Sequence, residues 1–368
     1  MNECIDMPAT RIDGLTVSAY TIPTDRRPES DGTAVWDSTT LVLVEIDAGG
    51  KRGTGWTYES AAAAALIRDQ LADLVRGEHA MDTRGIWKKL IGAVRNSGRS
   101  GLASYAIAAI DIALWDLRAR LCETALCDLM GVARDAVPIY GSGGFTSYEI
   151  PVLQKQLGDW AAAGMTAVKM KVGRDHAADV ARVAAARDAI GPTCHLFVDG
   201  NDGYAVEEAI EIARRFAEYD VTWFEQPVDH NDLVGTRRVR EHAPPGMAIA
   251  SGEYVTDTSR AALVADAVDV LQADASRCGG YTGFLAIDGY CEVVRKPLSS
   301  HCGPMLHLHV AAASLRLRHI EYFHDHVRIE RMLFDGFIEP DRGVLRPDRT
   351  RPGHGLTFKR ADADRYAV

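Results

Sequence analysis

The chain of 368 residues contains only seven cysteines, an odd number without a single CxxC spacing. This pattern argues against a disulfide framework or a structural zinc ribbon, and it is typical of a reducing compartment. Residues 1–15 also lack a basic start followed by an apolar run, so we expect no signal peptide. Together these absences predict a cytoplasmic protein.

An excess of positive charge and a long apolar run are missing as well. The formal net charge is −10, which disfavours nucleic acid and anionic membranes as partners because both reward a basic surface. Charged residues interrupt the apolar segment 101–121, so we expect no membrane span. Neither GxxxxGK[ST] nor GxGxxG occurs, which leaves nucleotide binding without support. At 47% hydrophobic and 25% charged residues, the composition is that of an ordinary soluble globular protein.

The length of the chain predicts two domains, because one hydrophobic core rarely extends so far. The first part has the patterns of strands and then of helices, at residues 12–21 and 40–47 and at 60–75, 82–91 and 102–121. We therefore expect an α+β domain at residues 1–133 and a second domain of alternating strands and helices at 134–333. Residues 334–368 show little periodicity, and we expect them to run back over the first domain.

Charged residues stand at or just past the ends of six apolar runs, at nearly even intervals: Lys171, Asp199, Glu225, Glu253, Asp274 and His301. Helical patterns separate the runs. Polar residues at the carboxyl ends of successive strands are typical of a (β/α) barrel, in which they form an active site at one mouth. The predicted barrel strands are residues 137–140, 166–170, 195–198, 221–224, 247–250, 268–273, 296–300 and 319–323.

Three of these residues are carboxylates on successive predicted strands: Asp199, Glu225 and Glu253. Carboxylates held so close together repel one another unless a cation neutralises them. Hard oxygen ligands at a site with room for a substrate favour Mg²⁺. The alternative is that each residue is a solvated surface acid.

The remaining residues of the series suggest two acid/base groups. Lys169 and Lys171 are two residues apart on one strand, so both point to the barrel interior, where each lysine is expected to lower the pKa of the other. Lys171 then becomes usable as a general base; the alternative is an edge strand whose lysines face solvent. Asp274 precedes His301 by one strand and helix, and a carboxylate bonded to an imidazole equips it as a second acid/base.

The ordered set of motifs resembles the mandelate racemase subgroup of the enolase superfamily, over the whole chain. The motifs are Val-Lys-Met-Lys-Val at 168–172, Val-Asp-Gly-Asn at 198–201, Phe-Glu-Gln-Pro at 224–227, Ser-Gly-Glu at 251–253, Asp274 before Gly279-Gly280, and Ser-Ser-His at 299–301. The resemblance implies a modified (β/α)₇β TIM barrel with an N-terminal α+β capping domain. It also implies one Mg²⁺ held by the three carboxylates.

The resemblance further implies individual roles. Lys171 is one base and the dyad of His301 and Asp274 is the other, while Glu321 corresponds to an acid that hydrogen-bonds a substrate carboxylate oxygen. Asn201 corresponds to an asparagine near the lysines. Enolase-superfamily sites use a Lys or His base with Mg²⁺ to stabilise an enediolate. Because a carboxylate substrate makes the site more negative, Lys169 and a protonated Glu321 would be needed to offset the added charge.

Two facing acid/base groups allow two outcomes. If His301 returns a proton to the α-carbon, the product is the epimer, as in a racemase. If it protonates a β-hydroxyl, water leaves and a 2-keto-3-deoxy acid forms. We favour an acid-sugar dehydratase because most members of the subgroup with these motifs are of that kind. A muconate-cycloisomerase-like reaction requires a lysine at the end of the sixth strand, and the Asp274 found there disfavours this reaction. The non-enzymatic alternative is a catalytically silent binding protein.

Substrate specificity is expected to come from loops around the barrel mouth. The long polar segment 24–39, which contains Arg26 and Trp36, and the turn at 49–55 are candidates, together with Tyr140 and His324 on the barrel. We expect a small carboxylate substrate such as an acid sugar, no nucleic-acid or membrane partner, and a homo-oligomer between a dimer and an octamer.

Overall fold

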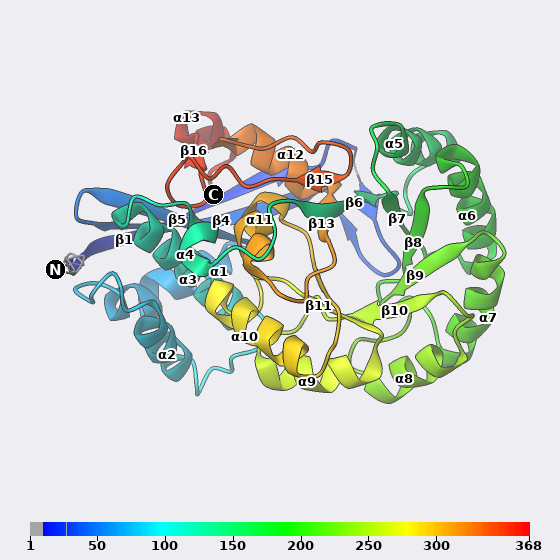
Figure 1. The fold of residues 1–368 in the computed structure, drawn as a ribbon, viewed down its shortest axis with the longest axis horizontal. Coiled ribbons are helices and arrows are strands. Elements are labelled where there is room, and N and C mark those ends of the chain that lie inside the picture. The colour runs from blue at the N-terminus through cyan, green and yellow to red at the C-terminus, as the bar shows by residue number, and fades with distance from the viewer. Residues whose placement is uncertain (1–9, 27) are drawn as a thin grey trace.

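The computed structural model describes residues 10–26 and 28–368. Residues 1–9, most of the segment in which we expect no signal peptide, lie outside the described residues. The first part of the chain is an antiparallel sheet in the order β1-β4-β5, covered by helices (Figure 1). Its elements are β1 (Ile12–Pro23), β2 (Glu29–Ser30), β3 (Val35–Trp36), β4 (Ser38–Ala48), β5 (Lys51–Tyr58), α1 (Ala62–Leu66), η1 (Ile67–Leu71), η2 (Ala72–Leu74), α2 (Thr83–Ala93), α3 (Leu102–Leu121) and α4 (Leu126–Met130).

The second part is a parallel barrel of eight strands, in the order β12-β11-β10-β9-β8-β7-β6-β13. A bridge between Leu298 and Leu317 joins its two ends. The strands are β6 (Val137–Gly143), β7 (Ala167–Lys171), β8 (His195–Asp199), β9 (Val221–Glu225), β10 (Ala248–Ser251), β11 (Val270–Ala273), β12 (Leu298–Ser300) and β13 (Ile320–Phe323). Seven helices connect them, namely α5 (Ile150–Ala162), α6 (His176–Ile190), α7 (Val206–Ala217), α8 (Leu233–His242), α9 (Thr258–Ala267), α10 (Gly280–Val293) and α11 (Pro304–Ala313).

This architecture confirms the predicted (β/α)₇β barrel with an N-terminal capping domain. Each predicted barrel strand overlaps an observed one, with ends shifted by at most three residues. Figure 1 shows helices α5 to α10 around the outside of the strands. None of the helices in the described part of the chain is both long enough and apolar enough to cross a bilayer.

Local sequence signals account for the boundaries of the barrel helices. The side chain of Asp175 accepts hydrogen bonds from the backbone N–H groups of Ala177 and Ala178 and so caps the start of α6. Gly191, with φ of +71°, ends the same helix because glycine takes a left-handed backbone without strain. Asp232 and Asp257 cap α8 and α9 in the same way as Asp175. Because its cap fixes the residue at which each of these helices starts, the strand that follows the helix enters the barrel at a defined position relative to its neighbours.

The barrel core fixes the level of the charged residues. A layer of apolar side chains fills the interior below them, formed by Tyr140, Ala167, Phe197, Trp223, Ala250 and Val270. In register, Lys171 pairs with Asp199, and Asp199 pairs with Glu225. The carboxyl ends of three neighbouring strands therefore meet at one height, directly above an apolar floor.

The C-terminal residues lie against both parts of the molecule. They include α12 (His324–Leu333), β14 (Phe334–Asp335), β15 (Val344–Leu345), β16 (Thr357–Phe358), α13 (Arg360–Ala363) and η3 (Asp364–Tyr366). Strand β15 pairs with β6 of the barrel, and the backbone N–H of Val368 donates to the carbonyl of Ala19 in β1. The division into domains at residues 133 and 333 stays our proposal.

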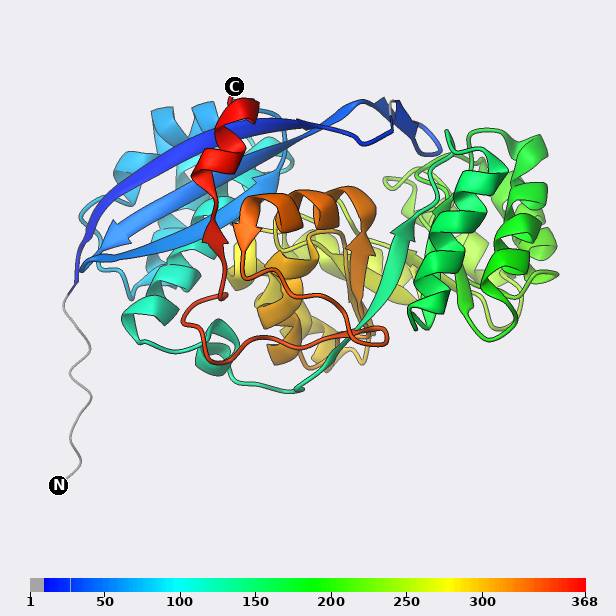
Figure 2. The ribbon, with the colours of Figure 1, turned by 90° about the horizontal axis from the view of Figure 1, so that it is seen from above.

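Residues 24–39, with Arg27 outside the described residues, form what we call the lid segment. Strand β1 carries it away from the cap sheet to the barrel, where Figure 2 shows it in dark blue beside the green helices. Ser30 and Thr146 share a hydrogen bond through their hydroxyl groups, and Thr33 Oγ1 donates to the carbonyl of Asn201 at 2.9 Å. Arg174 donates to the carbonyls of Asp31 and Ala34. The lid segment is thereby attached to the loops after β6, β7 and β8.

The turn at residues 49–55 does not serve the barrel mouth, and the prediction that it contributes to specificity is wrong. A Cβ atom on Gly53 would lie 2.2 Å from the carbonyl oxygen of Ala113, and one on Gly55 would lie 2.3 Å from that of Ala109. Both contacts are to α3 of the cap. The glycines are there because β5 approaches the backbone of α3 too closely for any side chain.

Candidate active site

Eight charged side chains converge at the carboxyl ends of seven barrel strands, and all are buried. Lys169 and Lys171 project inward from β7, and Asp199 and Glu225 end β8 and β9. The others follow or lie within β10 to β13: Glu253, Asp274, His301 and Glu321. None of these side chains is more than 7% exposed, so the cluster is withdrawn from solvent in this closed arrangement.

The two lysines form one side of the cluster and pair with its carboxylates. Lys169 Nζ lies 2.5 Å from Glu225 Oε1, 2.8 Å from Glu321 Oε1 and 3.4 Å from Asp199 Oδ2. Lys171 Nζ lies 2.5 Å from Asp199 Oδ2. The lysines are therefore inside the barrel, and the alternative of an edge strand facing solvent is wrong.

The expected lowering of the lysine pKa is not what this arrangement produces. Burial lowers the pKa of Lys171, and the ammonium of Lys169 lowers it further, but Asp199 and the neighbouring glutamates raise it above its ordinary value. The pKa of Lys169 is also raised, because Glu225 and Glu321 outweigh its burial. Like-charge repulsion is real here but smaller than the attraction to carboxylates, which the spacing of the two lysines alone does not reveal.

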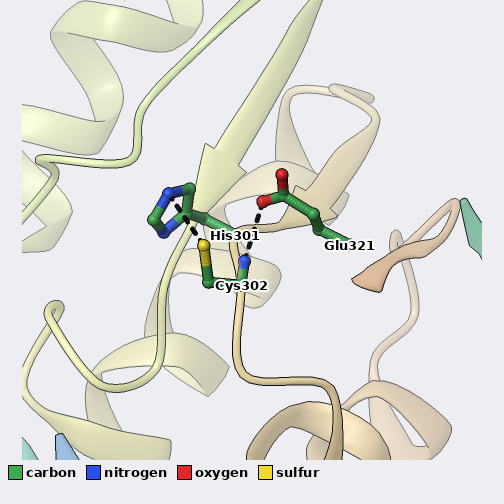
Figure 3. Close-up of side chains that lie close together, drawn as sticks. All are labelled: His301, Cys302 and Glu321. Carbon is green, nitrogen blue, oxygen red and sulfur yellow. Dashed lines mark hydrogen bonds between the residues drawn. The ribbon is translucent and has the colours of Figure 1, made fainter. Parts of the chain in front are cut away.

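Glu321 lies between the lysines and the histidine side of the cluster. Its Oε1 accepts from the Ser142 hydroxyl at 2.6 Å, and its Oε2 accepts from the backbone N–H of Cys302 at 2.8 Å (Figure 3). Burial raises the pKa of Glu321, but Lys169, His301 and Lys171 lower it below its ordinary range. In this arrangement two hydrogen-bond donors and three positive charges favour the carboxylate, and the protonated Glu321 expected with a bound substrate stays a prediction.

The opposite side of the cluster is an imidazole held between carboxylates. His301 Nδ1 lies 2.8 Å from Asp274 Oδ2, while its Nε2 lies 3.2 Å from Glu253 Oε2 and 3.2 Å from the Cys302 sulfur. Asp274 is itself fixed, since its Oδ1 accepts from the Ser276 backbone and hydroxyl. The backbone N–H of Ala275, the residue directly after Asp274, donates to His307 Nε2. The ring of His301 is thus held with Nδ1 toward Asp274 and Nε2 toward the cluster.

The electrostatics of His301 favour its protonated form. Burial lowers the pKa of His301, but Cys302, Glu253 and the hydrogen bond to Asp274 raise it well above its ordinary value. The pKa of Asp274 is lowered, because His301 and His307 outweigh the effect of burial. In this arrangement His301 can hold a proton at Nε2, where it faces Glu253.

The three predicted metal ligands have the chemistry that a hard divalent cation requires. Asp199 and Glu225 share Lys169, so their oxygens lie near one another, and burial together with Asp199 raises the pKa of Glu225 to about 7. Glu253 lies beside His301 and Arg277, whose charges outweigh its burial and lower its pKa. The three carboxylates are not among the groups of described residues whose ligand atoms all lie within 4.8 Å of one another, but their hard oxygen atoms are the donors that Mg²⁺ prefers.

Of the residues predicted to bind substrate, Asn201 lies closest to the cluster. Its backbone N–H donates to Asp199 Oδ1 at 3.0 Å, and its side-chain Oδ1 is buried without a hydrogen-bond partner among the described residues. Tyr140 is instead part of the apolar floor, fully buried with its ring 5.4 Å below Lys169 Nζ. It supports the lysine from beneath.

Trp36, Arg26 and His324 point away from the cluster. Trp36 Nε1 donates to Asp325 Oδ2 at 3.2 Å, which attaches the lid segment to α12. Arg26 and His324 line a separate surface pocket of about 510 Å³ beside Tyr148 and α5, and His324 Nε2 pairs with Asp25. A role for these three in substrate binding stays a prediction.

Several residues at the site escaped the sequence analysis. Arg277 lies 3.5 Å from Glu253 Oε1 and 3.6 Å from Asp274 Oδ2, and thus places a cation beside both. Trp223 Nε1 donates to Glu225 Oε2 at 3.0 Å. Ser142 and Cys302 complete the surroundings of Glu321. Arg277 could have been predicted at the site because it stands only three residues after Asp274. Trp223 could have been predicted because alternation along β9 places it on the same inward face as Glu225.

The chain matches two family models that together cover most of its length. Residues 16–131 match the N-terminal domain of mandelate racemase / muconate lactonizing enzymes. Residues 152–363 match the enolase C-terminal domain-like family.

Relatives and solved structures agree with these matches. The chain is 33% identical to 3,6-anhydro-alpha-L-galactonate cycloisomerase of Streptomyces coelicolor, over 97% of this chain and 99% of that protein. A mandelate racemase/muconate lactonizing enzyme-like protein from Rubrobacter xylanophilus superposes with a TM-score of 0.96 and 48% identity, over 97% of this chain and 100% of that one. L-talarate/galactarate dehydratase from Salmonella typhimurium, liganded with Mg and L-lyxarohydroxamate, superposes with a TM-score of 0.90 and 29% identity, over 100% of this chain and 95% of that one.

Proposed function

The chain belongs to the mandelate racemase / muconate lactonizing enzyme family of the enolase superfamily, and from that membership we propose that it is a Mg²⁺-dependent acid-sugar dehydratase. It abstracts the proton on the carbon next to a substrate carboxylate, and loss of water from the neighbouring carbon then gives a 2-keto-3-deoxy acid. The assignment to dehydration is supported by the similarity to L-talarate/galactarate dehydratase.

One observation carries the proposal. Two acid/base groups face the same set of buried carboxylates from opposite sides: Lys171 Nζ is 2.5 Å from Asp199, and His301 Nε2 is 3.2 Å from Glu253. A substrate carbon placed above these carboxylates has a proton acceptor on one face and a proton donor on the other. That is the arrangement needed to remove a proton and expel a hydroxyl in one site.

The metal requirement rests on Asp199, Glu225 and Glu253, which would hold Mg²⁺. A bound Mg²⁺ would supply positive charge that stabilises the enediolate formed when an α-proton leaves a carboxylate. The relative from Salmonella typhimurium carries Mg with its ligand, which supports this choice of metal. Lys169 adds positive charge at the same edge of the site.

Lys171 and His301 each carry out one of the two proton transfers. With Mg²⁺ on Asp199, that carboxylate would attract the ammonium of Lys171 less strongly, and Lys171 in its neutral form would take the α-proton at Nζ. Lys169 holds Glu225 and Glu321 in place. His301, with its proton at Nε2, protonates the β-hydroxyl so that it leaves as water. Asp274 keeps the imidazole oriented and stabilises its charged form. The enol that results tautomerises to the 2-keto-3-deoxy acid, so carbon, hydrogen and oxygen balance with one water released.

An isomerase is the second candidate, because a relative that covers nearly the whole chain is a cycloisomerase. In an isomerase the same first proton transfer is followed by return of a proton to carbon, with no loss of water. Racemisation or epimerisation of a 2-hydroxy acid belongs to this class.

A screen of aldonic acids, aldaric acids and their anhydro and lactone forms with Mg²⁺ in D₂O tests the proposal. Formation of a 2-keto-3-deoxy acid with loss of one water, and with deuterium at C3 of the product, supports the dehydratase. Deuterium exchange at the α-carbon of the substrate, or any isomeric product formed without loss of water, supports the isomerase. If no acid shows either deuterium exchange or conversion, the enzymatic proposal is wrong.

Two variants and a matched control sharpen the test. Lys171→Ala and His301→Asn are each expected to abolish net turnover while Mg²⁺ still raises the melting temperature. Lys155→Ala, which removes a lysine from an exposed ion pair on α5, is expected to leave turnover unchanged. Full activity in either of the first two variants contradicts the assignment of the two bases.

A further inference from the structure

A second cluster of metal-ligating side chains joins the lid segment to the start of α12. It consists of Asp25 and Glu29 from the lid segment and His324 and Asp325 from α12, each offering one ligand atom, and these atoms all lie within 4.8 Å of one another. None of these residues belongs to the active-site cluster described above. The cluster therefore requires its own explanation.

The two inner carboxylates are buried and incompletely paired. Glu29 and Asp325 are both 0% exposed. Glu29 Oε1 accepts from the Tyr148 hydroxyl at 3.1 Å and Asp325 Oδ2 accepts from Trp36 Nε1, but Glu29 Oε2 and Asp325 Oδ1 have no hydrogen-bond partner among the described residues. A buried acceptor left without a partner destabilises the fold, and more so if it is charged. Burial and Asp325 raise the pKa of Glu29 to about 10, so these two carboxyl groups require either a shared proton or a bound cation.

Among the described residues, which exclude Arg27, the nearby basic groups do not pair with these oxygens. His324 Nε2 lies 3.0 Å from Asp25 Oδ2, at the outer edge of the cluster. Arg328 donates to the backbone carbonyl of Pro23, and Arg26 lies over the ring of Tyr148. Neither arginine forms an ion pair of 4 Å or less with Glu29 or Asp325.

Asp25 and His324 form the solvent-exposed edge of the cluster. The side chains of Asp25 and His324 are 41% and 24% exposed, and both line the surface pocket of about 510 Å³. An ion can therefore enter through Asp25 and His324 and meet Glu29 and Asp325 behind them.

We propose that Asp25, Glu29, His324 and Asp325 bind a divalent cation of the Mn²⁺ or Zn²⁺ type, which fastens the lid segment to α12. One imidazole with carboxylates is a donor set that these ions accept, whereas Mg²⁺ is usually bound by oxygen ligands alone. The all-oxygen site at Asp199, Glu225 and Glu253 and this mixed site thus differ in the metal they select. The role of the second ion is structural, because it joins two chain segments far apart in sequence.

Binding of Zn²⁺ in the presence of saturating Mg²⁺ tests the proposal directly. The full chain is equilibrated with buffered Zn²⁺, separated from free metal by gel filtration, and analysed for metal content. We expect the wild type to retain one Zn²⁺ per chain. The double variant Glu29→Gln, Asp325→Asn should bind Zn²⁺ at least about tenfold more weakly, because losing a ligand or its supporting residue commonly lowers metal affinity by about 10–100-fold. His324→Ala, at the exposed edge where folding is least affected, is expected to show a similar loss.

A second acidic cluster supplies the matched control. Asp202, Asp229 and His230 also lie within ligand distance of one another, but Asp202 already accepts hydrogen bonds from Gln226 and His230. Asp229→Asn should therefore leave Zn²⁺ retention unchanged, as should Glu225→Gln in the active site. If the wild type retains no Zn²⁺, Glu29 and Asp325 share a proton instead and the proposal is overturned. Retention that survives both the double substitution and His324→Ala overturns it as well.

Discussion

His301 Nδ1 lies 2.8 Å from Asp274 Oδ2, and the two residues come from neighbouring strands β12 and β11. The contact fixes which nitrogen of the ring faces the other carboxylates. Asp274→Asn keeps the shape of the side chain but removes its charge, so the imidazole loses both its orientation and the stabilisation of its protonated form. We expect turnover to fall by about 10²–10⁴-fold, the usual contribution of a positioned acid/base.

The measurement is steady-state turnover of the substrate found in the acid screen, with the binding of Mg²⁺ monitored separately. Mg²⁺ binding should remain, because Asp274 is not among the proposed ligands. A variant that keeps wild-type turnover would show that His301 works without its carboxylate.

Lys169 holds two glutamates that would otherwise repel one another inside the barrel. Lys169→Met leaves Glu225 and Glu321 without their shared ammonium, and removing one partner of a buried ion pair typically costs about 3–5 kcal/mol. We expect a loss of that order in the free energy of unfolding, measured by denaturant titration without metal. Lys155→Met, which breaks an exposed pair with Asp159, should change stability little. Equal effects of the two substitutions would contradict the importance of burial.

Removal of Mg²⁺ should stop turnover and lower thermal stability together. A ligand that binds only the folded chain stabilises it by about 2.7 kcal/mol at 100 times its dissociation constant. We therefore expect a Mg²⁺-dependent rise in melting temperature that EDTA reverses, and that Glu225→Gln largely removes. Unchanged Mg²⁺ stabilisation in the Glu225→Gln variant would place the metal elsewhere.

The barrel and the positions of its charged residues were predictable because both depend on local patterns. Apolar runs that end in a charged residue mark the strands, and their even spacing leaves room for one helix each. Once the strands are parallel neighbours, Asp199 and Glu225 must lie together, since adjacent carboxyl ends meet at one mouth. These steps need only strand periodicity and chain order.

The electrostatic state of the site was harder to predict, because it depends on distances that sequence spacing does not give. Lys171 has Lys169 as its neighbour in sequence, but its nearest charge in space is Asp199 at 2.5 Å, on the next strand. The same limit applies to Trp36 and Arg26. Their place in a long loop indicated a role in substrate specificity, while the direction of each side chain depends on contacts with α12 and Tyr148.

Stability should also depend on pH through Glu330, which is fully buried on α12 and accepts from the backbone N–H of Met305 at 3.0 Å. Burial raises the pKa of Glu330 from 4.5 to about 8. The folded chain then keeps a proton that the unfolded chain releases above about pH 4.5. The contribution of this residue to stability is full below that pH and is lost as the pH rises towards 8.

Comparison with Glu330→Gln isolates this effect, because glutamine resembles the protonated acid and does not titrate. The free energy of unfolding of the wild type, measured against that of the variant at pH 5, 6.5 and 8, should fall as the pH rises. A difference that stays constant over this range would show that Glu330 is ionised in the folded protein.

The lid segment depends on a close approach between Gly32 and the loop after β8. A Cβ atom on Gly32 would lie 2.1 Å from the carbonyl oxygen of Gly200 and 2.8 Å from that of Val172, and neither backbone atom can move without displacing a strand end. Gly32→Ala should therefore push the lid segment off the barrel mouth and lower kcat/KM. The change in global stability should be small, because the only residue of β2 and β3 that packs against a hydrophobic core is the partly buried Trp36. Gly14→Ala is the matched control, since a Cβ there meets no atom within 4 Å. Wild-type kinetics for Gly32→Ala would mean that closure of this segment does not limit the reaction, whereas impaired kinetics in both variants would point to a general effect of the added methyl group.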